Sequence, residues 1–337
     1  MSSGCRHNSA WTLGQAFSQP RDIVAVSPLG RISTPAGAHI EGDSALRDAA
    51  EIRDIENPWL TQSVYMPERG QFSLEQTSGL AWSPDGRFLV IAINNVGGEP
   101  YLLAYWDIHR RQYRRLLIGN LSGTSDLACS QSGTYIAVSS RLSKDPPLYL
   151  WRAQNGVFHF VEPIFRFDRH SHHLLGIRSL AFSASEQLLF AVGEVGASAP
   201  NVLAHWDELL LLTLPDLRIQ HSIKAPEQVF ALSWRANQND VVLCGSYGRM
   251  FTLNIKTGEA VRLPLQGALC RCHPCDDDLC AFLAGDNITI ARLSDGAIVS
   301  ERVVAEQDIG TLDMRWSLDG NKLYVASGTG RTYVYAL

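Results

Sequence analysis

The sequence contains 337 residues, of which 45% are hydrophobic and 19% are charged, a balance that supports a folded core and excludes disorder of the whole chain. Its formal net charge of −5 argues against broad binding along a nucleic-acid backbone, which requires a strongly basic surface. The longest aliphatic run, around Leu209 to Leu214, is far shorter than the ~20 residues that cross a bilayer, and the first residues lack the apolar core of a secretory signal, so we expect a soluble, cytoplasmic protein.

One short pattern, an apolar–x–apolar strand followed by a tight turn, recurs seven times along the chain. Successive copies are separated by 38 to 56 residues, which brackets the roughly 40–45 residues of a four-stranded propeller blade. The chain therefore encodes an array of one repeated unit. The copies are IVAVSPLG from Ile23, GLAWSPDG from Gly79, DLACSQSG from Asp126, SLAFSASE from Ser179, ALSWRANQ from Ala231, LCRCHPCD from Leu269 and DMRWSLDG from Asp313.

Each copy places two apolar side chains on the same face of its first strand, because residues two apart in a strand point the same way. The second of the two is usually the bulkier, and it is Trp82, Trp234 and Trp316 in three of the copies. We expect these Trp side chains to be inward-facing anchors of the core with no role in ligand binding.

The two ends of the chain suggest how the array closes. The last copy stops at Leu337 after three strands, and we expect Trp11–Phe17, ahead of the first copy, to supply the fourth. Such pairing closes a ring and removes the exposed strand edges that promote aggregation. Residues 33–70 are polar and charged without strand alternation, so we interpret them as an insertion in the first unit, partly helical around Ser44 to Ile55.

Further strands follow the turn in each copy. Phe88–Ala92 and Tyr101–Trp106 are examples of second and third strands, and the fourth follows pairs such as Asn155-Gly156 and Asp295-Gly296. Asn-Gly and Asp-Gly favour tight hairpins, because both turn residues adopt positive φ. The sequence therefore predicts an all-β fold, a seven-bladed β-propeller of four-stranded antiparallel blades that forms a single domain over residues 1–337.

The repeats resemble those of the WD40-type β-propeller family over nearly the whole chain. The chain departs from the family in keeping the Trp-Asp ending only at Trp106-Asp107 and in lacking the Gly-His pair that usually opens a repeat; His173 stands near the place of that His, but His172 replaces the Gly. The resemblance implies a rigid disc whose loops bind protein partners. It is carried by WSPDGRFLVIA at 82–92, YWD at 105–107, YLWR at 149–152, LAFSASEQLLFAVG at 180–193 and WSLDGNKLYVASGTGRTYVYAL at 316–337.

The seven cysteines lie mostly inside apolar strand patterns, so we expect reduced thiols and no disulfide framework. CRCHPC, followed by Cys280, has the residue types of a zinc site. Cys270 and Cys272, however, fall on the two core-facing positions of their copy, where a buried cysteine acts as a small hydrophobe. We therefore predict no metal and no cofactor.

Two polar clusters are further candidates for ligand binding. HRRQYRR at 109–115 interleaves basic and aromatic residues, as nucleic-acid and anionic-lipid patches do, but its position in a hairpin predicts a solvated rim. HSHH at 170–173 follows Arg169 in a loop. We interpret its histidines as solvated, because a metal site needs three or four converging ligands.

Gly-x-Ser-x-Gly, His-Glu-x-x-His, P-loop and Gly-x-Gly-x-x-Gly motifs are absent from the sequence. We therefore expect a non-catalytic protein–protein interaction scaffold, monomeric outside its complexes, that binds one or more proteins or peptides and neither nucleic acid nor membranes. The alternatives are a propeller enzyme of the hydrolase or lyase type, with its site at the mouth of the central channel, and an anionic-lipid-binding propeller. Two observations separate these classes. Acidic residues and histidines with a bound ion at the channel mouth indicate an enzyme, whereas an apolar patch with a polar rim indicates binding of a protein partner.

The partner site is predicted on the face where second-to-third and fourth-to-first connections emerge, with Arg169 to His173 between two of the long second-to-third loops. These loops are Asn94–Pro100, Ser140–Pro147 and Glu194–Asn201, whereas the fifth to seventh copies have short ones. Loops on a rigid scaffold concentrate recognition. Binding weakens below about pH 6.5 if the histidines must stay neutral. The predicted partner-binding residues are Glu99, Arg141, Lys144, Arg169, His172 and His173.

Overall fold

The computed structural model describes most of the chain from residue 25 onwards, as β-strands and one short 3-10 turn, η3 (Ser246–Gly248). No helix in the described ranges is long and apolar enough to cross a membrane. The described residues are 25–35, 48–57, 60–65, 75–83, 85–95, 102–117, 124–130, 132–140, 148–154, 157–161, 174–183, 185, 188–195, 206–215, 218–237, 239–304, 312–327 and 332–337.

The strands pair into seven antiparallel sheets, each built from strands that are consecutive in sequence. The first three sheets are β1 (Ala25–Val26), β2 (Arg31–Pro35), β3 (Asp48–Asp54), β4 (Thr61–Tyr65); β5 (Glu75–Trp82), β6 (Phe88–Asn95), β7 (Leu102–Asp107), β8 (Gln112–Leu117); and β9 (Thr124–Cys129), β10 (Tyr135–Ser140), β11 (Leu148–Gln154), β12 (Val157–Val161). The fourth and fifth are β13 (Leu174–Phe182), β14 (Leu188–Val195), β15 (Trp206–Thr213), β16 (Arg218–Lys224); and β17 (Val229–Trp234), β18 (Asp240–Gly245), β19 (Arg249–Asn254), β20 (Ala260–Gln266). The sixth and seventh are β21 (Cys270–Cys272), β22 (Leu279–Ala284), β23 (Asn287–Arg292), β24 (Ile298–Val303); and β25 (Leu312–Trp316), β26 (Lys322–Ser327), β27 (Thr332–Ala336).

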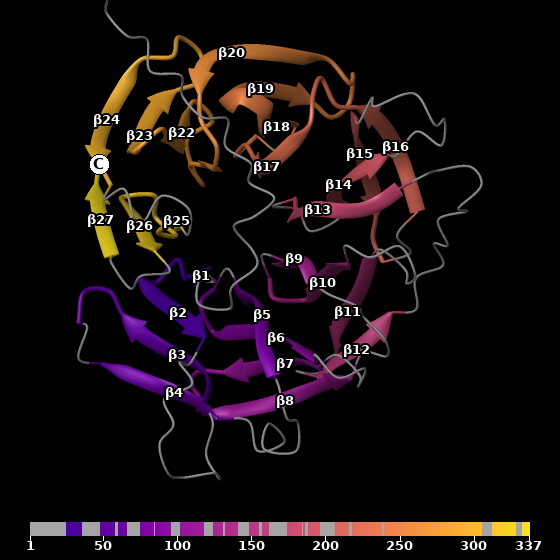
Figure 1. Ribbon diagram of the computed structural model, residues 1–337, viewed down its shortest axis with the longest axis vertical. Helices are drawn as coiled ribbons and strands as arrows, with labels where there is room; N and C mark the ends of the chain where they lie inside the picture. The colour runs from indigo at the N-terminus through magenta and orange to yellow at the C-terminus, as the bar shows by residue number, and fades with distance from the viewer. Residues whose placement is uncertain are drawn as a thin grey trace, which may run out of the picture.

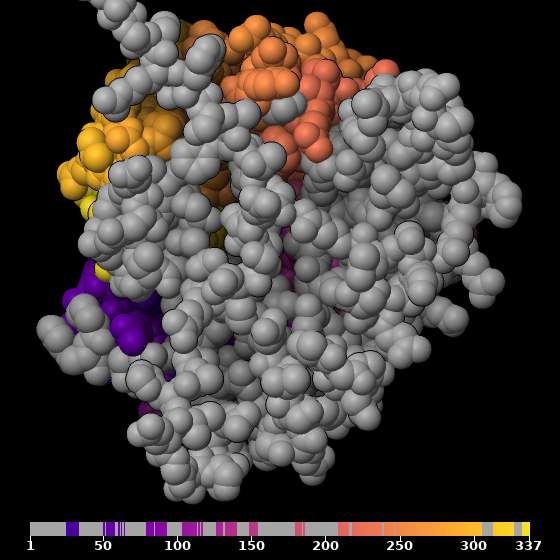
Figure 2. Space-filling model, viewed as in Figure 1, coloured from indigo at the N-terminus to yellow at the C-terminus, as the bar shows by residue number. Residues whose placement is uncertain are grey.

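The sheets follow one another around a common centre (Figure 1). First strands such as β1, β9, β13 and β25 lie towards the middle, and β4, β8, β20 and β24 lie at the rim. The outer strands of the fifth and sixth sheets are at the molecular surface, orange and gold in Figure 2. They expose the apolar side chains of Val261, Ile298 and Val303.

The core lies between the sheets, and each sheet packs on the next through an apolar cluster. Between the first and second sheets, for example, Ile52 packs with Leu89 and Ile91. A further cluster joins Val26 of the first sheet to Tyr324 of the last. The two ends of the array are therefore neighbours in space.

The turn after the first strand is built the same way in several copies. Its Ser hydroxyl accepts a hydrogen bond from the backbone N–H that begins the second strand, at 2.8 Å in Ser83 and 2.9 Å in Ser130 and Ser317. The closing glycine has positive φ, 71° at Gly133 and 76° at Gly320, a conformation that costs other residues free energy. The repeated Ser-x-x-Gly pattern thus specifies each hairpin locally.

The interpretation of residues 33–70 as an insertion with a helix around Ser44 to Ile55 was wrong. Asp48–Asp54 is β3 and Thr61–Tyr65 is β4, the third and fourth strands of the first sheet. Ala50 and Ile52 are buried while Arg53 is exposed, so the segment does alternate. The charged residues that stand beside Ala50 and Ile52 in the sequence obscured this short buried pattern.

Closure of the ring by Trp11–Phe17 stays a prediction, because these residues lie outside the described ones. The described part of the last sheet ends with β27, which pairs with β26 only. Tyr335 of β27 is nevertheless buried.

Candidate functional site

All six predicted partner-binding residues lie outside the described ranges: Glu99, Arg141, Lys144, Arg169, His172 and His173. The HSHH cluster at 170–173 also lies outside them. The strands that flank these segments are described, and their bounds fix which face each connection joins. Successive strands of a sheet are antiparallel, so connections from second to third strands leave and re-enter on one face, and first-to-second turns lie on the other.

The connections from second to third strands differ sharply around the molecule. They span residues 36–47, 96–101, 141–147 and 196–205 in the first four sheets. In the last three sheets they shrink to 246–248, 285–286 and 328–331. Long connections therefore occur on four neighbouring sheets, one more than the sequence predicted, because β3 places residues 36–47 among them.

The basic segment 109–115 forms the hairpin between β7 and β8, on the opposite face. His109, Arg110 and Arg111 are exposed, as predicted for a solvated rim. Oδ1 of Asp107 accepts hydrogen bonds from the backbone N–H groups of His109 and Arg110, both at 3.0 Å, and its Oδ2 lies 3.4 Å from Nη2 of Arg87. The Asp of the Trp-Asp pair is thus a turn cap.

The predicted anchors Trp82, Trp234 and Trp316 make one repeated contact. Each indole N–H donates to a backbone carbonyl of the preceding sheet's first strand, that of Ala25, Ala181 or Arg271, at 3.2, 3.2 and 2.9 Å respectively. Trp82 and Trp316 are buried, and Trp234 is partly buried. In the sixth sheet Cys272 takes this position, and its Sγ lies 3.7 Å from the Ser233 carbonyl oxygen. These side chains therefore join neighbouring sheets.

A charged cluster that the sequence analysis missed lies on the first strands of the sixth and seventh sheets. The guanidinium of Arg271 binds Oδ1 of Asp313 at 3.1 Å and the Met314 carbonyl at 3.1 Å. Oδ2 of Asp313 accepts the backbone N–H of Val26 in the first sheet at 2.9 Å. Three consecutive sheets are thus tied together near the centre.

Arg315 differs from Arg271, because its side chain makes no hydrogen bond or ion pair with the described residues. Burial and the neighbouring guanidinium of Arg271 lower the pKa of Arg315, which lies near enough to Cys129 of the third sheet to favour the ionised form of that thiol. Arg271 likewise interacts with Asp126 of the third sheet. Since the third sheet neighbours neither the sixth nor the seventh, these interactions cross the centre of the molecule.

Asp126 faces this central cluster and binds the fourth sheet. Its Oδ2 accepts the backbone N–H of Leu180 at 2.7 Å, and its Oδ1 accepts that of Leu127 at 2.8 Å. Burial raises the pKa of Asp126 to about 6, although these N–H groups and the charge of Arg271 oppose the shift.

The raised pKa of Asp126 gives a pH-dependent prediction. The folded state holds this proton more tightly than the unfolded state, so ionisation between about pH 4 and pH 6 destabilises the fold. The difference between the ordinary pKa of 3.8 and the pKa of about 6 in the folded protein corresponds to about 3 kcal/mol. Asp126→Asn keeps an oxygen for Leu180, so we expect it to be up to about 3 kcal/mol more stable than wild type at pH 7.5 and equal to it near pH 4, by denaturant unfolding at both pH values.

Asp319→Asn is the matched control for this prediction. Hydrogen bonds from Ser317 and Asn321 lower the pKa of Asp319. The ionised carboxylate therefore stabilises the fold, and the loss of stability caused by Asp319→Asn becomes smaller as the pH falls. A gain for Asp126→Asn that is the same at pH 4 and pH 7.5 would contradict the assignment.

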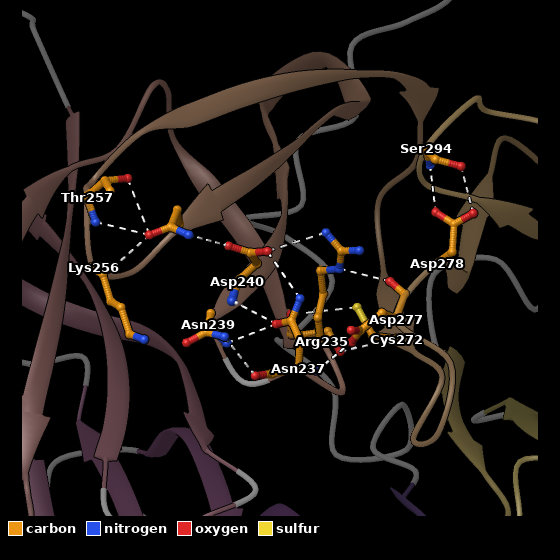
Figure 3. A network of polar contacts seen from close by, with 12 residues as sticks. Arg235, Asn237, Asn239, Asp240, Lys256, Thr257, Cys272, Asp277, Asp278 and Ser294 are labelled. Atoms are coloured by element: carbon orange, nitrogen blue, oxygen red, sulfur yellow. Dashed lines mark hydrogen bonds and ion pairs between the residues drawn. The ribbon is translucent and has the colours of Figure 1, made fainter.

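Polar side chains also link the first-to-second turns of the fifth and sixth sheets (Figure 3). Nε of Arg235 donates to the Asp277 carbonyl at 2.8 Å, and the Asn237 backbone N–H binds the Asp277 carboxylate. Asp240 accepts from Asn254 at 2.8 Å. The donors and acceptors of this network bind one another within the protein, so we assign the network the role of joining these two turns.

The CRCHPC segment contributes side chains to the core and then forms a turn. Nδ1 of His273 accepts the backbone N–H groups of Cys275 and Asp276 at 3.2 and 2.9 Å, so Nε2 carries the proton and donates to the Gly320 carbonyl at 3.0 Å. Cys270 and Cys280 are buried. Within the described part of the chain, no group of three or more His, Cys, Asp or Glu residues is arranged to hold a metal ion.

No family model matches the chain, and no curated protein matches its sequence. Among solved structures, a chain of a mitotic checkpoint complex is similar with a TM-score of 0.64 and 13% identity, covering 95% of this chain and 88% of that one. A chain of Kuenenia stuttgartiensis hydrazine synthase is similar with a TM-score of 0.65 and 13% identity, covering 99% of both. Both similarities extend over most of this chain, whose strands form consecutive antiparallel sheets around a common centre. The protein is a divergent β-propeller.

In this propeller, the positions of the two central arginines, Arg271 and Arg315, within their copies of the repeat could have identified them from the sequence. Arg271 and Arg315 stand between the two apolar positions of their copies, where the other five have Ala25, Ala81, Ala128, Ala181 and Ser233. Small residues fit where first strands converge, so two arginines at this position mark an unusual centre.

Proposed function

We propose that this propeller, with its seven sheets as the blades of one ring, is a non-catalytic scaffold that binds a protein or peptide partner. The partner docks on the face of the second-to-third connections, above the first four sheets. The observation that carries the proposal is the restriction of long connections to four neighbouring sheets, opposite three tight ones. Side chains on connections are free to vary, whereas those of the sheets hold the fold together.

The polar clusters of the described residues support this assignment, because their side chains already have structural roles. Asp107, Arg235 and His273 cap or join turns, and Asp313 ties two sheets together. Their hydrogen bonds are made inside the protein, so these side chains are not free to bind a partner, and the connections are the surface that we propose for recognition. Glu99, Arg141, Lys144, Arg169, His172 and His173 are the proposed contacts.

The similar chain from a mitotic checkpoint complex also supports a role in assemblies, since that protein is part of a multi-protein complex. The hydrazine synthase chain belongs to an assembly named for an enzyme. Sharing a fold at 13% identity carries neither the partner nor the activity across, because function depends on the site built on the fold.

The experiment replaces residues 96–101, 141–147 and 196–205 with Gly-Asn turns in the full chain. We expect partners captured by wild type, identified by mass spectrometry, to be lost at least tenfold while the melting temperature stays close to that of wild type. The control is Arg110→Ser with Arg111→Gly, on the opposite face, which should retain every partner. A well-folded shortened variant that keeps all partners would overturn the proposal, and loss in the control alone would move binding to the basic hairpin.

A further inference from the structure

Four thiols gather where the fifth and sixth sheets pack. Cys244 comes from β18, Cys270 and Cys272 from β21, and Cys280 from β22, all within one apolar cluster. All four are free. Cys244, Cys270 and Cys280 are fully buried, whereas Cys272 is partly exposed and lies beside the polar network of the fifth and sixth turns (Figure 3).

Cys272 and Cys280 are direct cross-strand partners. The His273 N–H binds the Leu279 carbonyl at 2.9 Å, which makes that neighbouring pair a hydrogen-bonded one. Because the two pair types alternate along antiparallel strands, Cys272 and Cys280 form a non-hydrogen-bonded pair, with Cα atoms about 4.5 Å apart and side chains on the same face. This separation falls within the range of about 4.4–6.8 Å found in disulfides.

The surroundings of the two thiols differ in a way that sets their roles. Hydrogen bonds with Cys280 and Ser233, together with the charges of Arg235 and Arg271, lower the pKa of Cys272 despite its burial. The hydrogen bond with Cys272 and burial raise the pKa of Cys280. Thiolates are the reactive form of cysteine, so Cys272 is the thiol that attacks and Cys280 keeps its proton.

We propose that Cys272 and Cys280 are a redox-modification site at which a peroxide forms a reversible disulfide between β21 and β22. The Cys272 thiolate attacks one peroxide oxygen; the S–O bond forms, the O–O bond breaks, and the departing hydroxide takes a proton from solvent to leave as water. Cys280 then attacks the sulfenic sulfur; the S–S bond forms, the S–O bond breaks, and the second hydroxide leaves as water with the Cys280 proton. The two thiols lose two electrons, and the peroxide gains them.

The same cluster contains an internal comparison. Cys244 and Cys270 also contact each other, and the hydrogen bond with Cys244 together with burial raises the pKa of Cys270 well above its ordinary value. Both side chains are 0% exposed, so peroxide does not reach them in the folded protein. We expect this pair to stay reduced under conditions that oxidise Cys272.

The test treats the full chain with a small excess of hydrogen peroxide, blocks remaining thiols, and maps linkages by mass spectrometry without reduction. Trypsin cuts after Arg271 and Asp-N cuts before Asp276, so a Cys272–Cys280 bond joins two peptides, whereas a bond between Cys272 and the exposed Cys275 stays within one. We expect the joined species to predominate, to be lost with dithiothreitol, and to form equally in Cys275→Ser.

Two variants separate the steps. In Cys280→Ser the sulfenic acid on Cys272 has no resolving thiol, so labelling by dimedone should rise at least fivefold over wild type. In Cys272→Ser the disulfide should disappear and Cys280 should remain alkylatable after unfolding. Mapping of the wild-type protein decides the proposal without any variant. The proposal is overturned if wild type keeps both Cys272 and Cys280 reduced, if it links Cys272 to Cys275, or if Cys244 and Cys270 are oxidised first.

Discussion

Trp316→Ala should destabilise the protein by about 3–5 kcal/mol, the cost typical of truncating a buried Trp. Trp316 is 5% exposed and fills the contact between the sixth and seventh sheets. Its indole N–H binds the Arg271 carbonyl, and its ring meets the imidazole of His273 edge-on with centroids 4.9 Å apart. Denaturant unfolding of wild type and variant measures the loss.

Trp316→Phe and Trp106→Phe separate the hydrogen bond from the packing. Both Trp side chains are buried, but Nε1 of Trp106 is buried without a hydrogen-bond partner among the described residues. Removing a paired donor costs stability, whereas removing an unpaired buried donor relieves a desolvation penalty. We expect Trp316→Phe to cost about 1–3 kcal/mol more than Trp106→Phe. Equal losses would assign the anchoring role to ring volume alone.

Gly320→Ala should be far more damaging than Gly133→Ala, although both glycines close the same kind of turn. Their φ angles are 76° and 71°, so Ala meets the left-handed strain of about 1–2 kcal/mol at either position. A Cβ on Gly320 would lie 2.3 Å from Cε1 of the His273 ring, whereas nothing lies within 4 Å of one on Gly133. Backbone N–H groups hold His273 in place, so the ring cannot yield freely.

We expect the difference between the two substitutions to be at least about 2 kcal/mol, from overpacking and the lost hydrogen bond to the Gly320 carbonyl. Chemical denaturation of both variants measures it. His273→Ser in the Gly320→Ala background should recover part of the loss, because Ser occupies this turn position in other copies and removes the clash. A double variant that loses the sum of both single effects would show that the ring is not the obstacle.

The repeat itself was readable from the sequence, because its signals are local. Alternating apolar residues define a strand face, and Ser and Gly at fixed positions define the turn that follows. The inward positions of Trp82, Trp234 and Trp316 follow from the same alternation. Residues 33–70 escaped this reasoning, since Ala50 and Ile52 are a short buried pair and the charged residues Glu51 and Arg53 stand beside them in the sequence.

The face on which connections gather was likewise predictable in part. The order of antiparallel strands places second-to-third connections on one side whatever their sequence, so their lengths can be compared before the structure is known. That residues 36–47 extend the set to a fourth sheet required the bounds of β2 and β3.

Contacts between different copies of the repeat were decided by the tertiary structure alone. Nothing local in Asp126 indicates that it meets the fourth sheet and the charge of Arg271, because these groups are far apart in sequence. The pairing of Cys272 with Cys280 depends on the register of β21 against β22, which the intervening turn sets. By itself the sequence determined most of the strands, their faces and their turns outside residues 33–70, since each depends on residues close along the chain. The structure decided the partners across the sheets and the centre, since those depend on how the repeats pack on one another.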